Sequence, residues 1–266
     1  MYTTPFRYIR PNTLAEAEAA FSAAEDPKYL AGGQTLIPTM KQRLAAPAEL
    51  IDLARIPALA GIRREGQQLV IGAAVCHAEV ATSQDVRTSI PALAALAGLI
   101  GDPAVRRRGT LGGSVANNDP AADYPAALLA LDARVTTTRR YIAAEGFFTG
   151  MFETALADGE IVTQIAFRIP KRAGYAKFPN PASHYAMVGV FVAQGEGIRV
   201  AVTGAGPCVF RVPEMEAALK ERFAPDAVAD VAVSPGTLNS DLHGSAEYRA
   251  HLIRVMAKRA VAAALG

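Results

Sequence analysis

Residues 29–41 read YLAGGQTLIPTMK and place two adjacent glycines between a short apolar run and a segment with helical spacing. Residues 28–31 are typical of a β-strand. The apolar residues that follow the glycines would share one face of a helix: Leu36, Ile37, Met40 and Leu44. Gly32 and Gly33 therefore lie at a predicted strand-to-helix junction, which we call the first loop (residues 31–35).

The flanking sequence predicts a small parallel sheet around this junction. Residues 6–9 and 49–53 have the composition of strands, and Thr13 with Glu16 matches the capping box that opens a helix. The predicted apolar face of that helix consists of Leu14, Ala17, Phe21 and Ala24. Strands that alternate with helices at this spacing favour parallel pairing.

The first loop has two interpretations that the residues alone leave open. A helix N-terminus presents unpaired N–H groups and a partial positive charge, and glycine lets the oxygens of an anion reach the backbone. A phosphate group would fit there. A glycine pair is, however, also required by a tight turn that binds nothing.

A second stretch of small residues favours the ligand interpretation. Residues 105–137 read VRRRGTLGGSVANNDPAADYPAALLALDARVTT and contain the second loop (residues 110–114), which combines glycines with hydroxyl side chains. Two loops of this kind suit a ligand with two neighbouring phosphates, such as a dinucleotide. Asp119 and Asp123 each precede a proline and predict helix starts, or alternatively a hydrogen bond to a ligand.

Several other functions find no support. Neither loop has the dinucleotide pattern G-x-G-x-x-G or the triphosphatase pattern G-x-x-x-x-G-K-[ST], and we find no hydrolase triad, general base or metal-ligand spacing. The net charge of +2 and the pI of about 8.6 give no indication of nucleic acid or membrane binding. The residues therefore indicate a bound ligand rather than catalytic side chains.

Composition bounds the architecture and the compartment. The 266 residues, 51% hydrophobic, can bury a substantial core and predict two or three subdomains. No apolar stretch is long enough to span a bilayer and the start lacks the long apolar segment of a signal peptide, so we expect a soluble cytoplasmic protein. Cys76 and Cys208 are expected to be buried thiols rather than a disulfide framework or iron–sulfur ligands.

Over nearly its whole length, the sequence resembles the FAD-binding medium subunit of the molybdenum hydroxylases. This group includes carbon monoxide dehydrogenase, xanthine dehydrogenase and related enzymes that oxidise aldehydes and N-heterocycles. The resemblance is carried by AGGQTLIPTMKQRL, LIDLARI, IGAAVCHAEVA, IGDPAVRRRGTLGGSVANNDPAADYPAALLALDA, FFTGMFETAL, KFPNPASHYAMVGVFVA and YRAHLIRVMAKRAV.

The resemblance implies an α+β (mixed α/β) fold. A two-part FAD-binding domain of the PCMH/VAO type would hold the pyrophosphate between its halves, residues 1–55 and 56–172. A small α+β C-terminal domain of the CO dehydrogenase flavoprotein type would follow at residues 173–266.

The resemblance also implies a function. The chain would be the electron-transfer subunit of a heterotrimer or a dimer of heterotrimers. It would accept electrons from [2Fe-2S] clusters of a small subunit, after substrate oxidation at the molybdenum cofactor of a large subunit, and pass them from FAD to an external acceptor. Two alternatives stay open: a scaffold or assembly subunit that transfers no electrons, and a free-standing flavin oxidase.

Matching the family motifs position by position assigns no catalytic or metal-binding residue. Residues alone would place Ile100 and Val162 in the core and Lys177 on the surface. His77, an isolated histidine, is expected to be a hydrogen-bonded structural residue, and Arg107 and His184 depart from the family pattern and receive no role. The implied FAD-binding residues are Ala31, Gly32, Gly33, Gln34, Thr35, Leu36, Ile100, Thr110, Leu111, Gly112, Gly113, Ser114, Asp123, Val162 and Lys177.

The remaining sequence predicts ordinary elements. Residues 149–170 indicate a helical start followed by a strand, and the runs on either side of QGEG (194–197) predict an antiparallel pair. The last segment predicts a core-packing helix, with Tyr248, Leu252, Val255, Met256 and Ala260 on one stripe.

Overall fold

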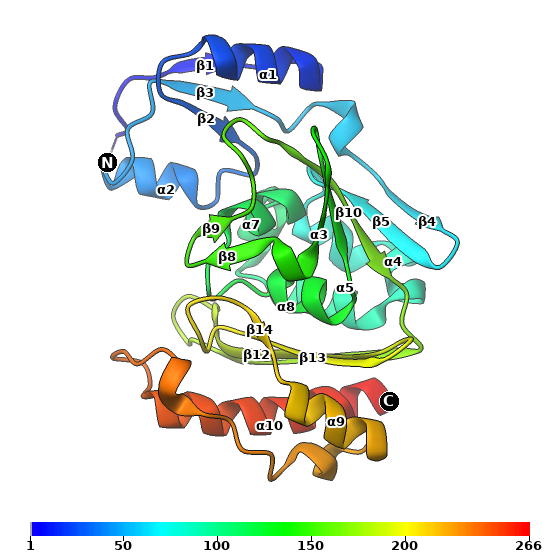
Figure 1. Cartoon of the computed structure of the whole chain (residues 1–266). Coiled ribbons are helices and arrows are strands. Elements are labelled where there is room, and N and C mark those ends of the chain that lie inside the picture. The colour runs from blue at the N-terminus through cyan, green and yellow to red at the C-terminus, as the bar shows by residue number, and fades with distance from the viewer. Residues whose placement is uncertain (1) are drawn as a thin grey trace.

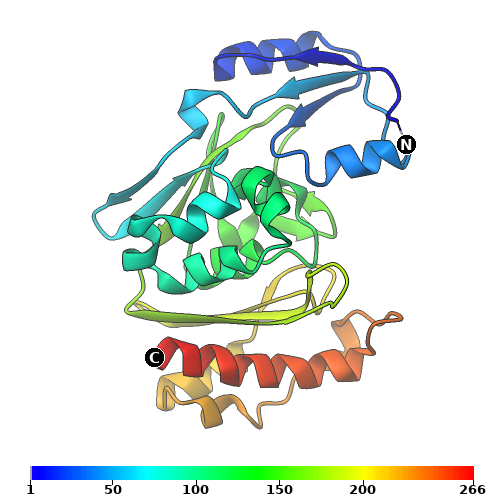
Figure 2. The same ribbon diagram turned by 180° about the vertical axis from the view of Figure 1, so that it is seen from behind.

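The computed structural model describes residues 2–266 and contains three main sheets that follow one another along the molecule. The N-terminal sheet (β1–β3) lies at one end, and the C-terminal sheet (β11–β14), with α9 and α10 beyond it, lies at the other (Figure 1). The central sheet and a group of short helices fill the space between them, and the view from behind shows the same order (Figure 2).

The N-terminal sheet is parallel, as predicted, with strand order β1-β3-β2. Its elements are β1 (Arg7–Ile9), α1 (Leu14–Ala23), β2 (Pro27–Leu30), α2 (Leu36–Lys41) and β3 (Glu49–Asp52). The Thr13 hydroxyl accepts a hydrogen bond from the Glu16 N–H at 3.1 Å and so caps α1. The prediction that Leu44 belongs to the buried face of α2 is wrong: Arg43 has a positive φ of 64°, the helix ends at Lys41, and Leu44 is 75% exposed.

The central sheet is antiparallel, with strand order β4-β5-β10-β6-β7. Its strands are β4 (Ile62–Glu65), β5 (Gln68–Gly72), β6 (Arg134–Thr137), β7 (Tyr141–Ala143) and β10 (Val162–Arg168). The helices beside it are α3 (His77–Thr82), α4 (Gln84–Ser89), α5 (Pro91–Gly98), α6 (Pro103–Arg108), α7 (Leu111–Asn117) and α8 (Tyr124–Ala130), with short 3₁₀ turns at Pro57–Leu59 and Ala144–Gly146. Apolar residues of the sheet and helices form one core.

The predicted helical start near residue 149 is wrong. That stretch forms a short hairpin of β8 (Phe148–Gly150) and β9 (Glu153–Thr154). Asn118, in a left-handed conformation, donates from its side-chain amide to the Gly150 and Glu153 carbonyl oxygens at 2.8 and 2.7 Å. A side chain from more than 30 residues away therefore fixes the hairpin.

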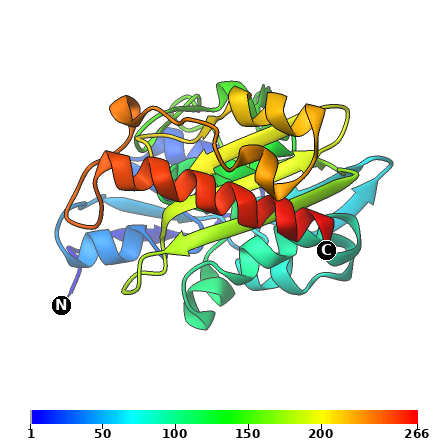
Figure 3. The same cartoon turned by 90° about the horizontal axis from the view of Figure 1, so that it is seen from below.

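The C-terminal sheet is covered on both faces (Figure 3). Its strands, β11 (Arg172–Pro179), β12 (Ala186–Gln194), β13 (Ile198–Thr203) and β14 (Phe210–Arg211), pair antiparallel, and Gln194 opposite Ile198 confirms the predicted pair. The helices α9 (Pro213–Glu221) and α10 (Ala246–Leu265) pack against one face, and 3₁₀ turns lie at Pro225–Val228 and Pro235–Thr237. Successive side chains of β12 point to opposite faces of the sheet: Val190 packs with residues of α9 and α10, whereas Phe191 packs in the central core. Because both faces are covered, β12 is buried along nearly its whole length.

The predicted mixed α/β architecture is thus confirmed. On α10, Leu252, Met256 and Ala260 are buried as predicted, but Tyr248 is 42% exposed. Cys76 and Cys208 are free but only partly buried, so the expectation of two buried thiols is wrong. Within residues 2–266, no helix is both long and apolar enough to cross a membrane.

Candidate functional site

Residues of both the first loop and the second loop line a cleft of about 590 Å³. Residues 183–185, which precede β12, and residues 160–162, at the start of β10, complete its lining. The cleft thus collects segments that are far apart in the sequence, and its volume lies in the range of small-molecule and cofactor sites.

Most of the residues that the family resemblance implies line this cleft. These are Ala31, Gly32, Gly33, Gln34, Thr35, Leu36, Ile100, Thr110, Gly112, Gly113, Ser114, Asp123 and Val162. Leu111 and Lys177 are not among the lining residues: Leu111 is fully buried and its N–H donates to the Val75 carbonyl oxygen, and Lys177 is buried against Asp123. The structure therefore brings together two loops that lie about 80 positions apart in the chain.

The first loop offers unpaired backbone donors to the cleft. Among the described residues, the N–H groups of residues 32–36 donate no hydrogen bond. The loop turns through Gly33, whose φ of +71° lies in the left-handed region that favours glycine. A row of donors without protein partners, on a segment that borders a cleft, is suited to oxygen atoms of an anion.

The second loop differs, because the protein itself uses its backbone donors. The N–H groups of Leu111 and Gly112 donate to the carbonyl oxygens of Val75 and Ala73 at 3.0 and 2.9 Å, and the Gly113 N–H donates to Thr110 Oγ1 at 3.1 Å. The loop is therefore not the source of free donors that its composition suggests. Among its side chains, Ser114 has a hydroxyl that makes no hydrogen bond within residues 2–266.

The glycines are required where the two loops meet. A Cβ on Gly32 would overlap the Arg108 carbonyl oxygen and lie 2.7 Å from Gly109 Cα. A Cβ on Gly113 would lie 2.8 Å from Thr110 Oγ1 and 3.2 Å from the Ala31 Cβ. Gly32 thus lets the first loop approach the backbone of Arg108 and Gly109, which leads into the second loop.

A buried ion pair lies at one wall of the cleft. Lys177 Nζ is 2.9 Å from Asp123 Oδ1, and it also donates to the carbonyl oxygens of Leu99 and His184 at 2.8 and 3.0 Å. The Tyr175 hydroxyl donates to the same carboxylate at 2.5 Å. Burial raises the pKa of Asp123, while the charge of Lys177 and the hydrogen bonds act in the opposite direction.

Two predictions from the residues alone are corrected here. Lys177, expected on the surface, has a side chain that is only 3% exposed. Asp119 does not begin a helix: its Oδ1 accepts from the Ala121 N–H at 2.8 Å, and α8 begins after Asp123, which makes no side-chain cap. The sequence reasoning also missed Tyr175, because a tyrosine within a strand is typical of any sheet.

His77 lines the cleft but does not have the hydrogen bonds that were expected of it. The residue is 4% exposed and its Nδ1 has no hydrogen-bond partner among residues 2–266. Burial, assisted by the charge of Arg106, lowers its pKa to about 4, so the ring is neutral at physiological pH. A Cβ on Gly109 would lie 2.7 Å from His77 Nε2, so the imidazole packs directly against the Gly109 backbone. The observed role of the His77 ring is therefore packing. Arg107 is exposed and His184 lines the cleft.

The sequence reasoning also missed the segment between β9 and β10. Leu156, Glu160 and Ile161 line the cleft next to the implied residue Val162. Nothing in the spacing of DGEI (158–161) indicated a ligand, because an acidic residue beside a glycine is typical of a surface turn.

These features fit FAD. The free N–H groups of the first loop would suit phosphate oxygens, the hydroxyls of Thr35 and Ser114 would add donors, and apolar residues such as Ile100 and Val162 would offer surface for aromatic rings. The site can therefore hold a large anionic cofactor, but it contains no nucleophile paired with a base.

Comparisons with known proteins agree with this chemistry. Residues 4–172 match the family described as the FAD binding domain in molybdopterin dehydrogenase, and residues 173–264 match the CO dehydrogenase flavoprotein C-terminal domain. The nicotine 6-hydroxylase medium subunit of Paenarthrobacter nicotinovorans is 36% identical over 96% of this chain and 95% of its own length. The carbon monoxide dehydrogenase medium chain of Hydrogenophaga pseudoflava is 37% identical over 97% and 96%.

Solved structures share the fold. A carbon monoxide dehydrogenase chain from Hydrogenophaga pseudoflava, from an enzyme that lacks the Mo-pyranopterin moiety, has a TM-score of 0.87 at 36% identity over 100% of this chain and 99% of its own. A quinoline 2-oxidoreductase chain from Pseudomonas putida 86 has a TM-score of 0.89 at 26% identity over 99% and 98%. The predicted two-part FAD-binding fold with a C-terminal α+β domain is therefore confirmed.

Proposed function

The chain belongs to the family of FAD-binding medium subunits of the molybdenum hydroxylases, and from this premise we propose that it transfers electrons between a partner subunit and an external acceptor. It is thus an oxidoreductase subunit whose cofactor is FAD. When bound, FAD supplies the capacity to exchange electrons singly or in pairs. Binding, orienting and shielding this cofactor are the tasks of the chain's own residues.

The unpaired N–H groups of residues 32–36 carry this proposal. They border the cleft, and the second loop closes on them through Gly32 and Gly113. We assign the pyrophosphate to the first loop, with the hydroxyls of Thr35 and Ser114 as additional donors. Of the remaining residues that the resemblance implies, Ile100 and Val162 offer apolar contact within the cleft. Leu111 and Lys177 are buried and do not line the cleft, so they would support the residues that do.

Asp123 has a supporting place in this proposal. Its carboxylate already receives hydrogen bonds from Tyr175 and Lys177, so only part of its acceptor capacity is left for a ligand. The pair would set the polarity of one wall and hold residues 183–185 in place through the Lys177 contact with the His184 carbonyl oxygen.

The names of the relatives support partner subunits: two are a medium subunit and a medium chain, and a third is subunit alpha of a dehydrogenase complex. We propose a large subunit with the molybdenum cofactor and a small subunit with [2Fe-2S] clusters, in a heterotrimer or a dimer of heterotrimers in the cytoplasm. The division of this chain at residues 55/56 and 172/173 is part of the same proposal. Substrate contacts would lie in the large subunit.

The test begins with the visible spectrum of the purified full-length chain after reconstitution with FAD, followed by release and identification of the cofactor. We expect one FAD per chain. Absence of FAD, even in a chain purified within its complex, would favour a scaffold or assembly subunit. Bleaching of the flavin by substrate with the isolated chain would favour a free-standing oxidase.

Electron transfer needs a separate measurement on the assembled complex. Removal of FAD should abolish reduction of the external acceptor but leave reduction of the iron–sulfur clusters by substrate intact. Acceptor reduction at the full rate without FAD would contradict the proposed role.

A further inference from the structure

Residues 155–161, the segment between β9 and β10, connect the wall of the cleft to the N-terminal sheet. Leu156, Glu160 and Ile161 of this segment line the cleft. The Tyr29 hydroxyl, from β2, donates to the Gly159 carbonyl oxygen at 3.2 Å. Gly159 has a positive φ of 69°, and a Cβ there would lie 3.0 Å from the Phe21 ring. The segment thus forms a second connection between the N-terminal sheet and the rest of the molecule, in addition to the contact between the two loops.

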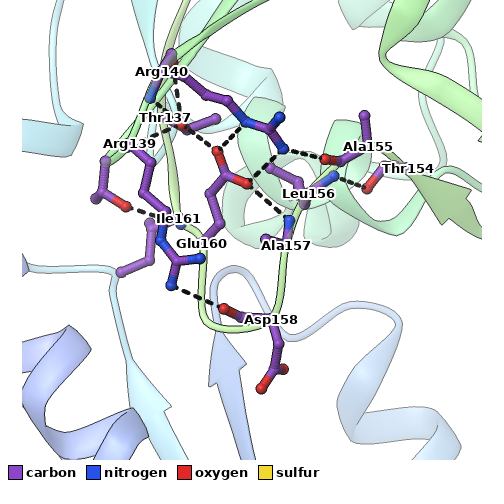
Figure 4. Close-up of polar contacts among 11 residues, drawn as sticks. Thr137, Arg139, Arg140, Thr154, Ala155, Leu156, Ala157, Asp158, Glu160 and Ile161 are labelled. Carbon is purple, nitrogen blue, oxygen red and sulfur yellow. Dashed lines mark hydrogen bonds and ion pairs between the residues drawn. The ribbon is translucent and has the colours of Figure 1, made fainter.

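One buried carboxylate organises this segment (Figure 4). Glu160 Oε1 accepts from Thr137 Oγ1 at 2.6 Å and from Arg140 Nε at 3.1 Å. Its Oε2 accepts from Arg140 Nη2 at 3.1 Å and from the Ala157 N–H at 2.8 Å. Arg140 Nη2 also donates to the Ala155 carbonyl oxygen at 2.6 Å. Thr137 and Arg140 therefore bind the segment directly at Ala155 and Glu160, and Glu160 in turn holds the Ala157 N–H.

We propose that Glu160 and Arg140 form a positioning pair that holds residues 155–161 against the cleft and thereby retains FAD. The inference rests on the proposed function, since it concerns how the same cleft holds the same cofactor. Neither residue is assigned to the chemistry. They act through the backbone of the segment, which presents Leu156 and Ile161 to the cleft and Gly159 to Tyr29.

The charges around Glu160 explain why the pair is needed. The Glu160 side chain is fully buried, whereas Arg140 is half exposed and is the only cation among residues 2–266 that forms an ion pair with the carboxylate. Two charged residues adjacent in sequence make other contacts: Arg139 donates to the Asp158 carbonyl oxygen, and the charges of Arg139 and Asp158 have opposite effects on the pKa of Tyr29. A buried carboxylate without its cation would be strongly unfavourable.

The pair also determines how the segment responds to pH. Burial alone would raise the pKa of Glu160, but the hydrogen bonds from Arg140, Ala157 and Thr137 and the charge of Arg140 lower it to about 2. A carboxyl group whose pKa is lower in the folded state stabilises that state above its unfolded pKa, and the stabilisation disappears as the pH falls through the folded pKa. In the wild-type chain the pair is therefore intact from mildly acidic pH upward.

Removal of the cation should reverse this dependence. In Arg140→Met the buried carboxylate keeps its burial but loses its counter-charge, so its pKa rises above the ordinary value. The segment would then be stable at low pH, where Glu160 is protonated, and would be weakened as the pH rises through the new pKa. A residue with only a packing role would not generate a titration.

The experiment measures the FAD dissociation constant of the flavin-depleted full-length chain between pH 5 and 9, relative to wild type. For Arg140→Met we expect FAD binding to be weaker by about tenfold or more at pH 8, with recovery toward pH 5. The double variant Arg140→Met with Glu160→Gln should lose this pH dependence. Arg140→Lys, which keeps the positive charge but loses the bidentate hydrogen bonding to Glu160, should give an FAD affinity between those of wild type and Arg140→Met.

A matched control is available in the C-terminal sheet. Arg211 and Glu216 form an ion pair at 2.6 Å, and neither residue lines the cleft. Arg211→Met should therefore leave the FAD dissociation constant and its pH profile unchanged. Thermal unfolding of the flavin-depleted variants identifies any variant that does not fold. If Arg140→Met does not fold, the FAD dissociation constant of Arg140→Lys is compared with that of the wild-type chain instead.

The outcomes separate the two proposals. A wild-type chain that binds no FAD would overturn the proposed function and this inference with it. If the wild-type chain binds FAD and the folded Arg140 variants bind it with the same affinity and pH profile, only the inference is wrong. A double variant that retained the pH dependence of Arg140→Met would also overturn it.

Discussion

The two glycine loops have similar compositions but perform different tasks. The N–H groups of residues 32–35 in the first loop and of Leu36 after it border the cleft and donate no hydrogen bond within residues 2–266. In the second loop, Leu111, Gly112 and Gly113 donate to the protein itself. A glycine-rich loop is therefore not by itself an anion site, because the same composition also serves close packing between segments.

The difference follows from what surrounds each loop. The first loop follows an edge strand of the small N-terminal sheet and faces the cleft, whereas the second loop lies on the core beside β5. A Cβ on Gly112 would lie 2.5 Å from the Ala73 Cβ, which shows how closely the second loop packs there. In the proposed site, the first loop would supply the binding groups, and the second loop, packed closely on β5, would position the first.

The largest effect is expected where the loops touch. Gly32→Val places side-chain atoms in the space of the Arg108 and Gly109 backbones, so the loops must separate. We expect loss of FAD and destabilisation by about 3 kcal/mol, at the upper end for overpacking. Flavin content and thermal unfolding would be measured together. Normal flavin content would contradict the loop contact.

Gly113→Val tests the same contact from the other side. A Cβ at position 113 would contact Thr110 Oγ1 and the Ala31 Cβ. The Thr110 hydroxyl can rotate away, so the overlap is less severe than at Gly32. We expect FAD to be lost on purification, with a smaller loss of stability, about 1–2 kcal/mol. A variant that retains stoichiometric FAD would show that the second loop does not limit the cleft.

Gly33→Ala isolates the backbone conformation of the first loop. At a φ of +71° an alanine is strained by about 1–2 kcal/mol, and its Cβ would lie 3.1 Å from Ile37 Cγ1. If the loop relaxes and turns its N–H groups away, the FAD dissociation constant rises about tenfold. Equilibrium titration of the flavin-depleted chain measures this, and an unchanged constant would contradict the role of these donors.

The smallest effects distinguish the two threonines. Thr110 caps α7 by accepting from the Gly113 N–H, so Thr110→Ala should lower the free energy of unfolding by about 1 kcal/mol. Thr35 makes no side-chain cap, so Thr35→Ala should leave that free energy within about 0.5 kcal/mol. The same variant should weaken FAD binding about fivefold, because a hydroxyl donor is lost. If Thr110→Ala and Thr35→Ala lowered the free energy of unfolding by the same amount, the proposed difference between the two threonines would be wrong.

The sequence predicted most local elements of the N-terminal part correctly, since strands, caps and helices there depend on neighbouring residues. It failed near residue 149, where Asn118 imposes a hairpin from a distance, and at Asp119, whose carboxylate forms a turn. Family membership was also predictable, because whole motifs around both loops carry it. The individual FAD contacts stay predictions.

By itself, the sequence determined the strand, glycine and helix order around residues 29–41, the family, and two of the segments that line the cleft. These features depend on local patterns and on motifs that can be recognised in the sequence alone. Only the tertiary structure decided which loop keeps free donors, and that Asp123 pairs with Lys177 and Glu160 with Arg140. The physical reason is that hydrogen bonding and burial depend on groups brought together from distant positions, which composition and spacing do not specify.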